Sequence, residues 1–221
     1  MTDEKRTYRK KRRAELEALT RERITESTVE LHGTVGPTRT SISAVAERAG
    51  VRRSTVYRHF PDEAALFSAC SSHWMAANPP PDPTGWAAIG DPDERLRAAL
   101  EELYAYYRRT ERMLDNLHRD EAAMPIVKRL FAGFRGHIAA GKETLMGGRA
   151  VRGSVRRRVR AAIGHSLAFP TWRSLARDQG LDDPEAVDLM CRLVAASGRR
   201  PGNRKRSHRP EPARATTGAR R

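Results

Sequence analysis

The fold is decided by residues 40–60, which read TSISAVAERAGVRRSTVYRHF. The apolar residues of the first half follow the i, i+3, i+4, i+7 spacing of a short amphipathic helix: Ile42, Val45, Ala46 and Ala49. Thr40 or Ser41 can cap the start of this helix, and Gly50 can end it as a left-handed turn residue. This stretch therefore predicts one short helix followed by a tight turn.

A second short helix is expected over about 53–60, with Val56 packing back onto the first helix. Two short helices joined in this way have the spacing of a helix-turn-helix, although an ordinary helical hairpin has the same spacing. The second helix would present hydrogen-bonding side chains outward, a composition suited to base edges and phosphates. These side chains are Arg53, Ser54, Thr55, Tyr57, Arg58 and His59.

Residues 40–60, together with the following Pro61–Phe67 (PDEAALF), resemble the signature of TetR-family transcriptional regulators. The resemblance covers about residues 20–75 closely, and the run 55–60 (TVYRHF) is its most specific part. It implies an all-α protein with an N-terminal three-helix helix-turn-helix DNA-binding domain and a C-terminal helical ligand-binding and dimerisation domain. It also implies a ligand-responsive repressor that binds a double-stranded DNA operator as a homodimer and responds to a small-molecule effector of unknown identity.

The family's residue roles carry over onto matching positions. Arg53 and Thr55 resemble positions that approach base edges, whereas Tyr57 and His59 resemble positions that bind phosphate. Ser54 occupies a position where a small residue lets the helix come close to DNA. Hydroxyls and free N–H groups at the start of the preceding helix can bind phosphate as well. The expected DNA-binding residues are Thr40, Ser41, Arg52, Arg53, Ser54, Thr55, Tyr57, Arg58 and His59.

Two positions depart from the family pattern. Arg52 stands where Ser or Thr usually caps the recognition helix, and Glu63 stands where a phosphate-binding lysine is usual. Glu63 would repel phosphate if it pointed towards the DNA. The basic stretch from Lys5 to Arg13 is expected to compensate by reaching an adjacent groove or backbone.

The charge is distributed very unevenly along the chain. Of the formal net charge of +15, residues 1–13 contribute +5 (seven Lys/Arg, two Asp/Glu) and residues 197–221 contribute +8 (nine Lys/Arg, one Glu), which leaves +2 for 14–196. Basic arms of this kind fit a polyanion partner, because they displace counterions from phosphates. Solvated tails that keep the protein in solution are the alternative.

The rest of the chain has the apolar periodicity of helices and no alternating pattern typical of β-strands. Helices are expected from about residue 14 to 31, then over 92–108, 110–119, 124–146, 155–178 and 184–196, with a linker over 78–92. The expected organisation is a basic arm (1–13), a DNA-binding domain (14–75), a regulatory and dimerisation domain (76–196) and a disordered basic tail (197–221).

Two roles are open for the apolar residues of the C-terminal part. Helices 155–178 and 184–196 could form a four-helix seam between two chains, or could close the core of their own domain. Aromatic and histidine side chains could line a pocket for a hydrophobic or planar effector, although such residues are more often core. The pocket candidates are Tyr104, Tyr107, Leu117, Phe131, Phe134, His137 and His165.

Other classes of protein find less support in the sequence. No catalytic triad, phosphate-binding glycine loop or dinucleotide fingerprint is present, so an α-helical enzyme is disfavoured and no cofactor is expected. Cys70 and Cys191 lie far apart, which argues against a metal site. No membrane span and no secretory signal are evident, so a cytoplasmic protein is expected. A sequence-indifferent, basic nucleic-acid-binding protein remains the principal alternative.

Overall fold

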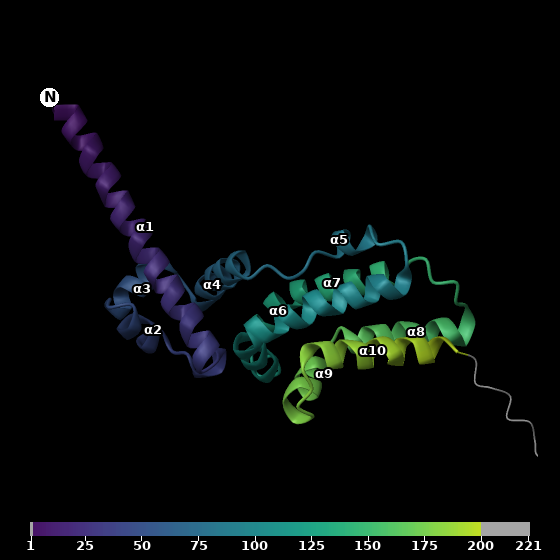
Figure 1. Cartoon of the computed structure of the whole chain (residues 1–221). Coiled ribbons are helices and arrows are strands. Elements are labelled where there is room, and N and C mark those ends of the chain that lie inside the picture. The colour runs from purple at the N-terminus through teal and green to yellow at the C-terminus, as the bar shows by residue number, and fades with distance from the viewer. Residues whose placement is uncertain (1, 200–221) are drawn as a thin grey trace, which may run out of the picture.

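The computed structural model describes residues 2–199, and over this range the chain is helical with no strand (Figure 1). The N-terminal elements are α1 (Thr2–Thr34), the 3₁₀ turn η1 (Pro37–Arg39), α2 (Ile42–Arg48), α3 (Arg53–His59) and α4 (Glu63–Ala77). The C-terminal elements are α5 (Pro83–Ala87), α6 (Pro92–Asp120), α7 (Pro125–Met146), α8 (Gly153–Ser166), α9 (Phe169–Arg173), the π-helical turn η2 (Ser174–Asp178) and α10 (Asp183–Gly198). The all-α prediction is confirmed.

The helix-turn-helix forms as its sequence predicts. Ser41, rather than Thr40, caps α2 by accepting a hydrogen bond from the Ala44 N–H, and Gly50 turns the chain with φ +63°. Val56 is completely buried between the helices. It belongs to a small core that α1, α2, α3 and α4 share: Ile24, Val45, Ala46, Ala49, Val56, Phe60 and Leu66.

Helix α1 begins earlier than expected. The sequence predicted its start near Ala14, yet the helix runs from Thr2, so the described part of the basic arm lies within the first half of α1. Arginine, lysine and glutamate are good helix formers, and an i, i+4 pair between Arg13 and Glu17 adds support. Figure 1 shows this half projecting away from the rest of the protein, and the described side chains from Glu4 to Leu19 are exposed.

A larger core fills the C-terminal part. Helices α8 and α10 lie side by side beneath α6 and α7 (Figure 1), and aromatic residues of α6 and α9 pack between them. Helix α6 is continuous over 92–120 where two helices were expected, because no glycine or proline interrupts it after Pro92. The helix expected over 155–178 is instead α8, α9 and η2, since Pro170 cannot donate a backbone hydrogen bond.

The loop expected over 78–92 contains the short helix α5. Trp86 on this helix is buried, donates from Nε1 to Glu102 (2.9 Å) and lies against Gly141, where a Cβ atom would come within 3.0 Å of the indole. Beyond the loop, Arg95 in the first turn of α6 donates hydrogen bonds to the carbonyls of Ile89 (2.8 Å) and Gly147 (2.9 Å). These contacts fix the first turn of α6 to the end of α7.

The last helix differs from expectation at both ends. Asp182, not Asp183, caps α10 in a capping box with Glu185, while Asp183 accepts a hydrogen bond from Trp172 Nε1 (3.0 Å). The helix continues to Gly198, so Ser197 and Gly198 are helical, and residues 200–221 of the predicted disordered tail lie outside the described residues. None of the described helices is both long and apolar enough to cross a membrane.

Candidate nucleic-acid interface and ligand cavity

The recognition helix α3 turns a polar face outward. Arg52, Arg53, Ser54, Tyr57 and Arg58 are exposed, and Thr55 and His59 are half-buried. Arg53 donates a hydrogen bond to the Tyr57 hydroxyl (3.3 Å), and its guanidinium lies 5.7 Å from the centre of the Tyr57 ring. Tyr57 is 41% exposed despite its size. A protruding, pre-ordered Arg–Tyr pair of this kind can reach the phosphates and base edges of a groove.

Arg21 of α1 holds the end of the recognition helix, which the sequence did not reveal. It donates to the His59 carbonyl, and its guanidinium lies 4.1 Å from the centre of the Phe60 ring. Burial lowers the pKa of His59, and the cationic Arg58 and Arg21 lower it further. In the protein without DNA, the His59 imidazole is therefore mostly neutral at pH 7.

The hydroxyls predicted to bind phosphate at the start of α2 already have partners within the protein. The Ser41 hydroxyl oxygen accepts from the Ala44 N–H (3.1 Å), and the Thr40 hydroxyl donates to the Gly36 carbonyl (2.8 Å). Thr40 is half-buried, whereas Ser41 is exposed. Of these two side chains, the exposed Ser41 is the one that a phosphate can reach.

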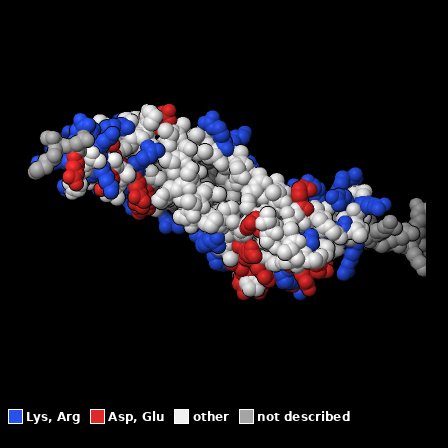
Figure 2. Space-filling model, turned by 90° about the horizontal axis from the view of Figure 1, so that it is seen from above, with Lys and Arg blue, Asp and Glu red and all other residues white. Residues whose placement is uncertain are grey.

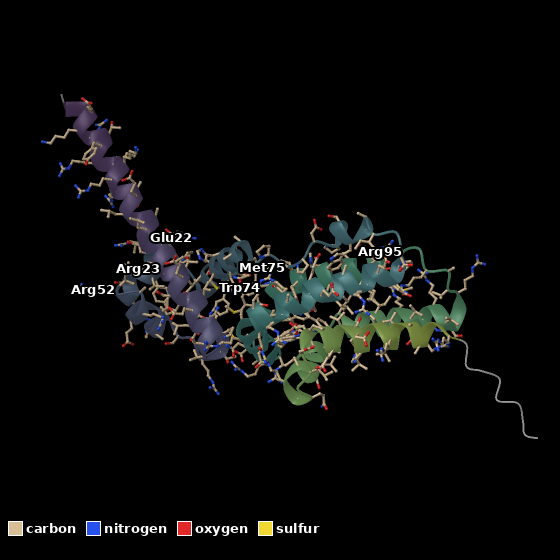
Figure 3. All side chains as sticks on the ribbon, viewed as in Figure 1. Glu22, Arg23, Arg52, Trp74, Met75 and Arg95 are labelled. Atoms are coloured by element: carbon tan, nitrogen blue, oxygen red, sulfur yellow. The ribbon has the colours of Figure 1, made fainter. Side chains whose placement is uncertain are left out.

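Both departures from the family pattern lie at the surface. Arg52 occupies the N-cap position of α3 without a side-chain capping hydrogen bond, and Figure 3 shows it at the outer edge of the α2–α3 unit. Glu63 is exposed in the first turn of α4, where Asp62 caps the helix. Figure 2 shows lysine and arginine at the α1 end of the molecule and again at the opposite end, while much of the surface between them is uncharged.

A cavity of about 270 Å³ lies between α1, α4, α6 and α7. No Lys, Arg, Asp or Glu is among the residues that line it within 2–199. Figure 3 shows Trp74 and Met75 near the end of α4, on the side of the C-terminal helices. The lining comprises Val29, His32, Phe67, Cys70, Ser71, Trp74, Met75, Met113, Leu114, Leu117, Val127, Leu130, Phe131, Gly133 and Phe134. An apolar enclosure of this kind suits a hydrophobic small molecule.

Three of the predicted pocket residues, Leu117, Phe131 and Phe134, line this cavity. The other four lie elsewhere. Tyr104 and Tyr107 are fully buried, and their hydroxyls donate to the carbonyls of Ser166 (2.9 Å) and Leu167 (2.6 Å). They join α6 to the end of α8, as core residues do.

The two predicted pocket histidines are also engaged in local structure. His137 Nε2 is 2.7 Å from the Pro81 carbonyl oxygen, so it ties α7 to the segment before α5. His165 Nδ1 and the Thr171 hydroxyl are 3.3 Å apart and join α8 to α9. Neither histidine is among the residues of the cavity wall.

The sequence prediction missed every lining residue of α1 and α4, as well as some of α6 and α7. His32 is 3% exposed, its ring centre is 4.6 Å from that of Phe67, and its Nδ1 is 3.4 Å from Cys70 Sγ. Burial lowers the pKa of His32 to about 4 and raises the pKa of Cys70 to about 12, so both side chains are neutral at pH 7. A histidine at the end of a predicted helix gives no signal of a cavity, because the wall opposite it is more than 80 residues away in sequence.

Polar contacts join the end of α1 to the end of α6 beside the cavity. Asn116 donates from Nδ2 to the carbonyls of His32 (2.9 Å) and Gly33 (3.0 Å). Asp120 accepts from the Thr38 N–H (2.9 Å), and Arg119 donates to the Val35 carbonyl (3.0 Å). We call Asn116, Arg119 and Asp120 the α6 clamp. Through it, the DNA-binding part is fixed to the helix that forms one wall of the cavity.

The apolar residues proposed for a dimer seam divide between two environments. Ile163, Leu167, Phe169, Trp172, Met190 and Val194 are buried in their own core. Leu189 and Leu193 on α10 are 44% and 40% exposed, although both are large and apolar. Within the described residues, α10 therefore keeps an outward apolar stripe beside α8.

An N-terminal helix-turn-helix with an exposed polar recognition helix, attached to a helical domain, defines a DNA-binding transcriptional regulator. No group of His, Cys, Asp and Glu that could hold a metal ion occurs in residues 2–199. Among known proteins, residues 24–70 match the sequence model of the bacterial regulatory proteins of the tetR family. None of the curated proteins matches this chain.

Solved structures show the same fold. A Mesorhizobium loti MAFF303099 protein assigned to the TetR-family transcriptional regulators is 18% identical, with a TM-score of 0.59 over 82% of this chain and 96% of that one. A TetR-like transcriptional regulator from Rhodococcus sp. RHA1 is 17% identical, with a TM-score of 0.58 over 82% and 98%. The fatty acid degradation regulator FadR from Bacillus halodurans is 15% identical, with a TM-score of 0.51 over 79% and 93%. The family model thus confirms the resemblance to the TetR family over residues 24–70, and the solved structures show the same fold.

Proposed function

We propose that this protein is a transcriptional repressor that binds its operator as a homodimer and leaves it when a small molecule occupies the cavity. The observation that carries the proposal is the composition of the cavity wall. Helices α1 and α4 form one side of it, and the same two helices share a core with the recognition helix, whose last residue, His59, accepts a hydrogen bond from Arg21 of α1. Occupancy of the cavity therefore acts on the elements that position α3.

In the DNA-bound state, α3 would enter the major groove. Arg53 and Thr55 would meet base edges, while Tyr57 and His59 would bind phosphates and fix the register. Exposed Arg52 and Arg58 flank these residues and would add backbone contacts. The projecting half of α1 would extend the contact along the DNA backbone, because it offers cations beyond the reach of α3.

Two recognition helices must be spaced one helical turn of DNA apart, about 34–36 Å, to occupy consecutive major grooves. Helix α10 offers the exposed Leu189 and Leu193 as part of a seam with α8 between two chains. Since α4 follows α3 after only Phe60, Pro61 and Asp62, a shift of α4 against α7 moves α3 as well. A ligand that favours the shifted state changes the spacing and lowers occupancy of the operator.

A filled cavity tests this proposal without knowledge of the ligand. Gly133 on α7 is an exposed residue that lines the cavity, and a Cβ atom there would meet nothing within 4 Å, so a leucine at this position can cover or enter the opening of the cavity. Gly136 lies one turn further along α7, has equally open surroundings and does not line the cavity. Gly136→Leu is therefore a control with the same change in helix propensity.

The measurement is binding of a labelled operator duplex by fluorescence anisotropy. Gly133→Leu should weaken binding about tenfold, the usual size of coupling between two sites, while Gly136→Leu should bind like the wild type. Equal affinity of the two variants for the operator would refute coupling between the cavity and the DNA-binding face.

A further inference from the structure

Within the apolar cavity wall, one side chain has an unsatisfied polar atom. His32 Nε2 is buried and has no hydrogen-bond partner within residues 2–199. The other ring nitrogen, Nδ1, is engaged by Cys70. Because Cys70 is a thiol at neutral pH, it can donate to Nδ1, which leaves Nε2 to carry the ring proton.

A buried polar group without a partner is costly in free energy, so such groups are rare and call for an explanation. The other buried side-chain atoms without a partner, Tyr106 Oη and His118 Nε2, belong to residues that do not line the cavity. The His118 ring lies between Phe131 and Phe169 in the aromatic core. Of the three residues only His32 lines the cavity, and because its Nε2 atom is covered, a ligand can bond to that atom only after the ring turns.

We infer that His32 is the polar anchor of the cavity, and that the cavity takes an uncharged, planar, largely apolar molecule carrying one hydrogen-bonding group. This inference rests on the proposed function, because it assigns a ligand class to the same cavity. Phe67, Trp74, Phe131 and Phe134 contribute aromatic rings to the wall, and aromatic rings favour contact with a planar molecule. A charged ligand would lose its hydration without gaining an opposite charge, since no ionised side chain lines the wall.

His32 also connects the cavity to the α6 clamp. Its side chain lines the cavity while its carbonyl accepts from Asn116, which belongs to the clamp. A ligand hydrogen-bonded to Nε2 therefore acts on His32, whose carbonyl joins α1 to Asn116 of α6. The ligand's polar group would decide both its affinity and its effect on the DNA-binding part.

The test uses three probes of one shape: naphthol, methylnaphthalene with the same substitution pattern, and the corresponding naphthoate. Calorimetric titration of the full chain should show naphthol binding about tenfold more tightly than methylnaphthalene, the usual size of one hydrogen bond. Naphthoate should bind most weakly of the three. Equal binding of naphthol and methylnaphthalene, tighter binding of naphthoate, or binding of none of the probes would overturn the inference.

His32→Phe should keep methylnaphthalene binding and reduce the preference for naphthol to within about twofold. His73→Phe makes the same substitution at an exposed position of α4 that does not line the cavity, and it should keep the tenfold preference. A tenfold preference that persists in His32→Phe would overturn the inference. If His32→Phe does not fold, the wild-type imidazole Nε2 resonance decides: it should shift with naphthol and stay unchanged with methylnaphthalene, and no shift with naphthol overturns the inference.

Operator binding by the same preparations separates the two proposals. Release of the operator by probes that show no dependence on His32 would overturn the anchor and leave the proposed function standing. A naphthol preference that depends on His32, together with operator binding that no cavity occupant changes, would support the anchor and refute the proposed release.

Discussion

The buried His32 makes the stability of the fold depend on pH. Burial lowers its pKa from the ordinary 6.5 to about 4, and the nearby Asp120 carboxylate offsets only part of this effect. Between these two values the unfolded chain binds a proton that the folded chain does not. The free energy of unfolding therefore falls as the pH is lowered from about 6.5 to about 4 and is not affected by this group above 6.5.

The size of the effect follows from the shift in pKa. One unit corresponds to about 1.4 kcal/mol, so the full loss is about 3 kcal/mol, of which about 2 kcal/mol is reached at pH 5. Such a loss is a large part of the 5–15 kcal/mol that typically stabilises a folded protein. Cys70, the contact of His32, does not titrate in this range, because burial raises its pKa to about 12.

Urea unfolding at pH 7 and pH 5, followed by circular dichroism, measures this difference. The wild type should lose about 2 kcal/mol more than His32→Phe on going from pH 7 to pH 5. His73→Phe removes an exposed histidine by the same substitution and should lose as much as the wild type. Parallel losses in the wild type and His32→Phe would refute the claim that His32 is buried in its neutral form.

Three further predictions concern the DNA-binding face and the turns that support it. Glu63→Lys should raise operator affinity and steepen its salt dependence by about one counterion. Glu101→Lys, at an exposed position of α6, should leave both quantities unchanged. If Glu63→Lys changes neither, residue 63 lies away from the DNA. Alanine at all four of Lys10, Lys11, Arg12 and Arg13 should lower operator affinity, and should reduce the slope of log affinity against log salt concentration by at most about 3.6. Anisotropy at several salt concentrations measures both. Unchanged binding would show that the arm does not contact the DNA. Gly36→Ala should lower the free energy of unfolding, measured with urea, by about 3 kcal/mol or more, because φ is +95° and the added Cβ atom meets the Arg119 guanidinium and Asp120 Oδ2. Gly50→Ala, where φ is +63° and the space is open, should lower it by only about 1 kcal/mol. Equal losses in the two variants would contradict the packing of Gly36 against the α6 clamp.

The helix-turn-helix could be predicted because its contacts are local. Val45, Ala46, Ala49 and Val56 lie within twelve residues, so their spacing alone defines how two short helices pack. The polar face of α3 follows once Val56 is assigned to the core. The caps Asp62 and Asp91 are local in the same way, because each accepts a hydrogen bond from an N–H group three residues further on.

The cavity could not be predicted, because its walls come from segments far apart in the chain. His32 and Cys70 meet across 38 residues, and Asn116 reaches His32 across 84. Aromatic periodicity alone cannot separate Phe131 at the cavity from Tyr104 in the core, since both lie on the buried faces of amphipathic helices. The choice between them depends on which helix packs opposite, and that is a tertiary property.

We expect α3 to read a defined DNA sequence. Selection from random duplex DNA, at two salt concentrations, tests it most directly with the wild type and the Arg53→Ala/Tyr57→Ala double variant. The wild type should enrich a two-fold symmetric site at both salt concentrations, and the double variant should enrich none. Tight binding by the wild type with no enriched sequence, or the same site recovered from the double variant, would contradict the claim and assign binding to the basic arms instead.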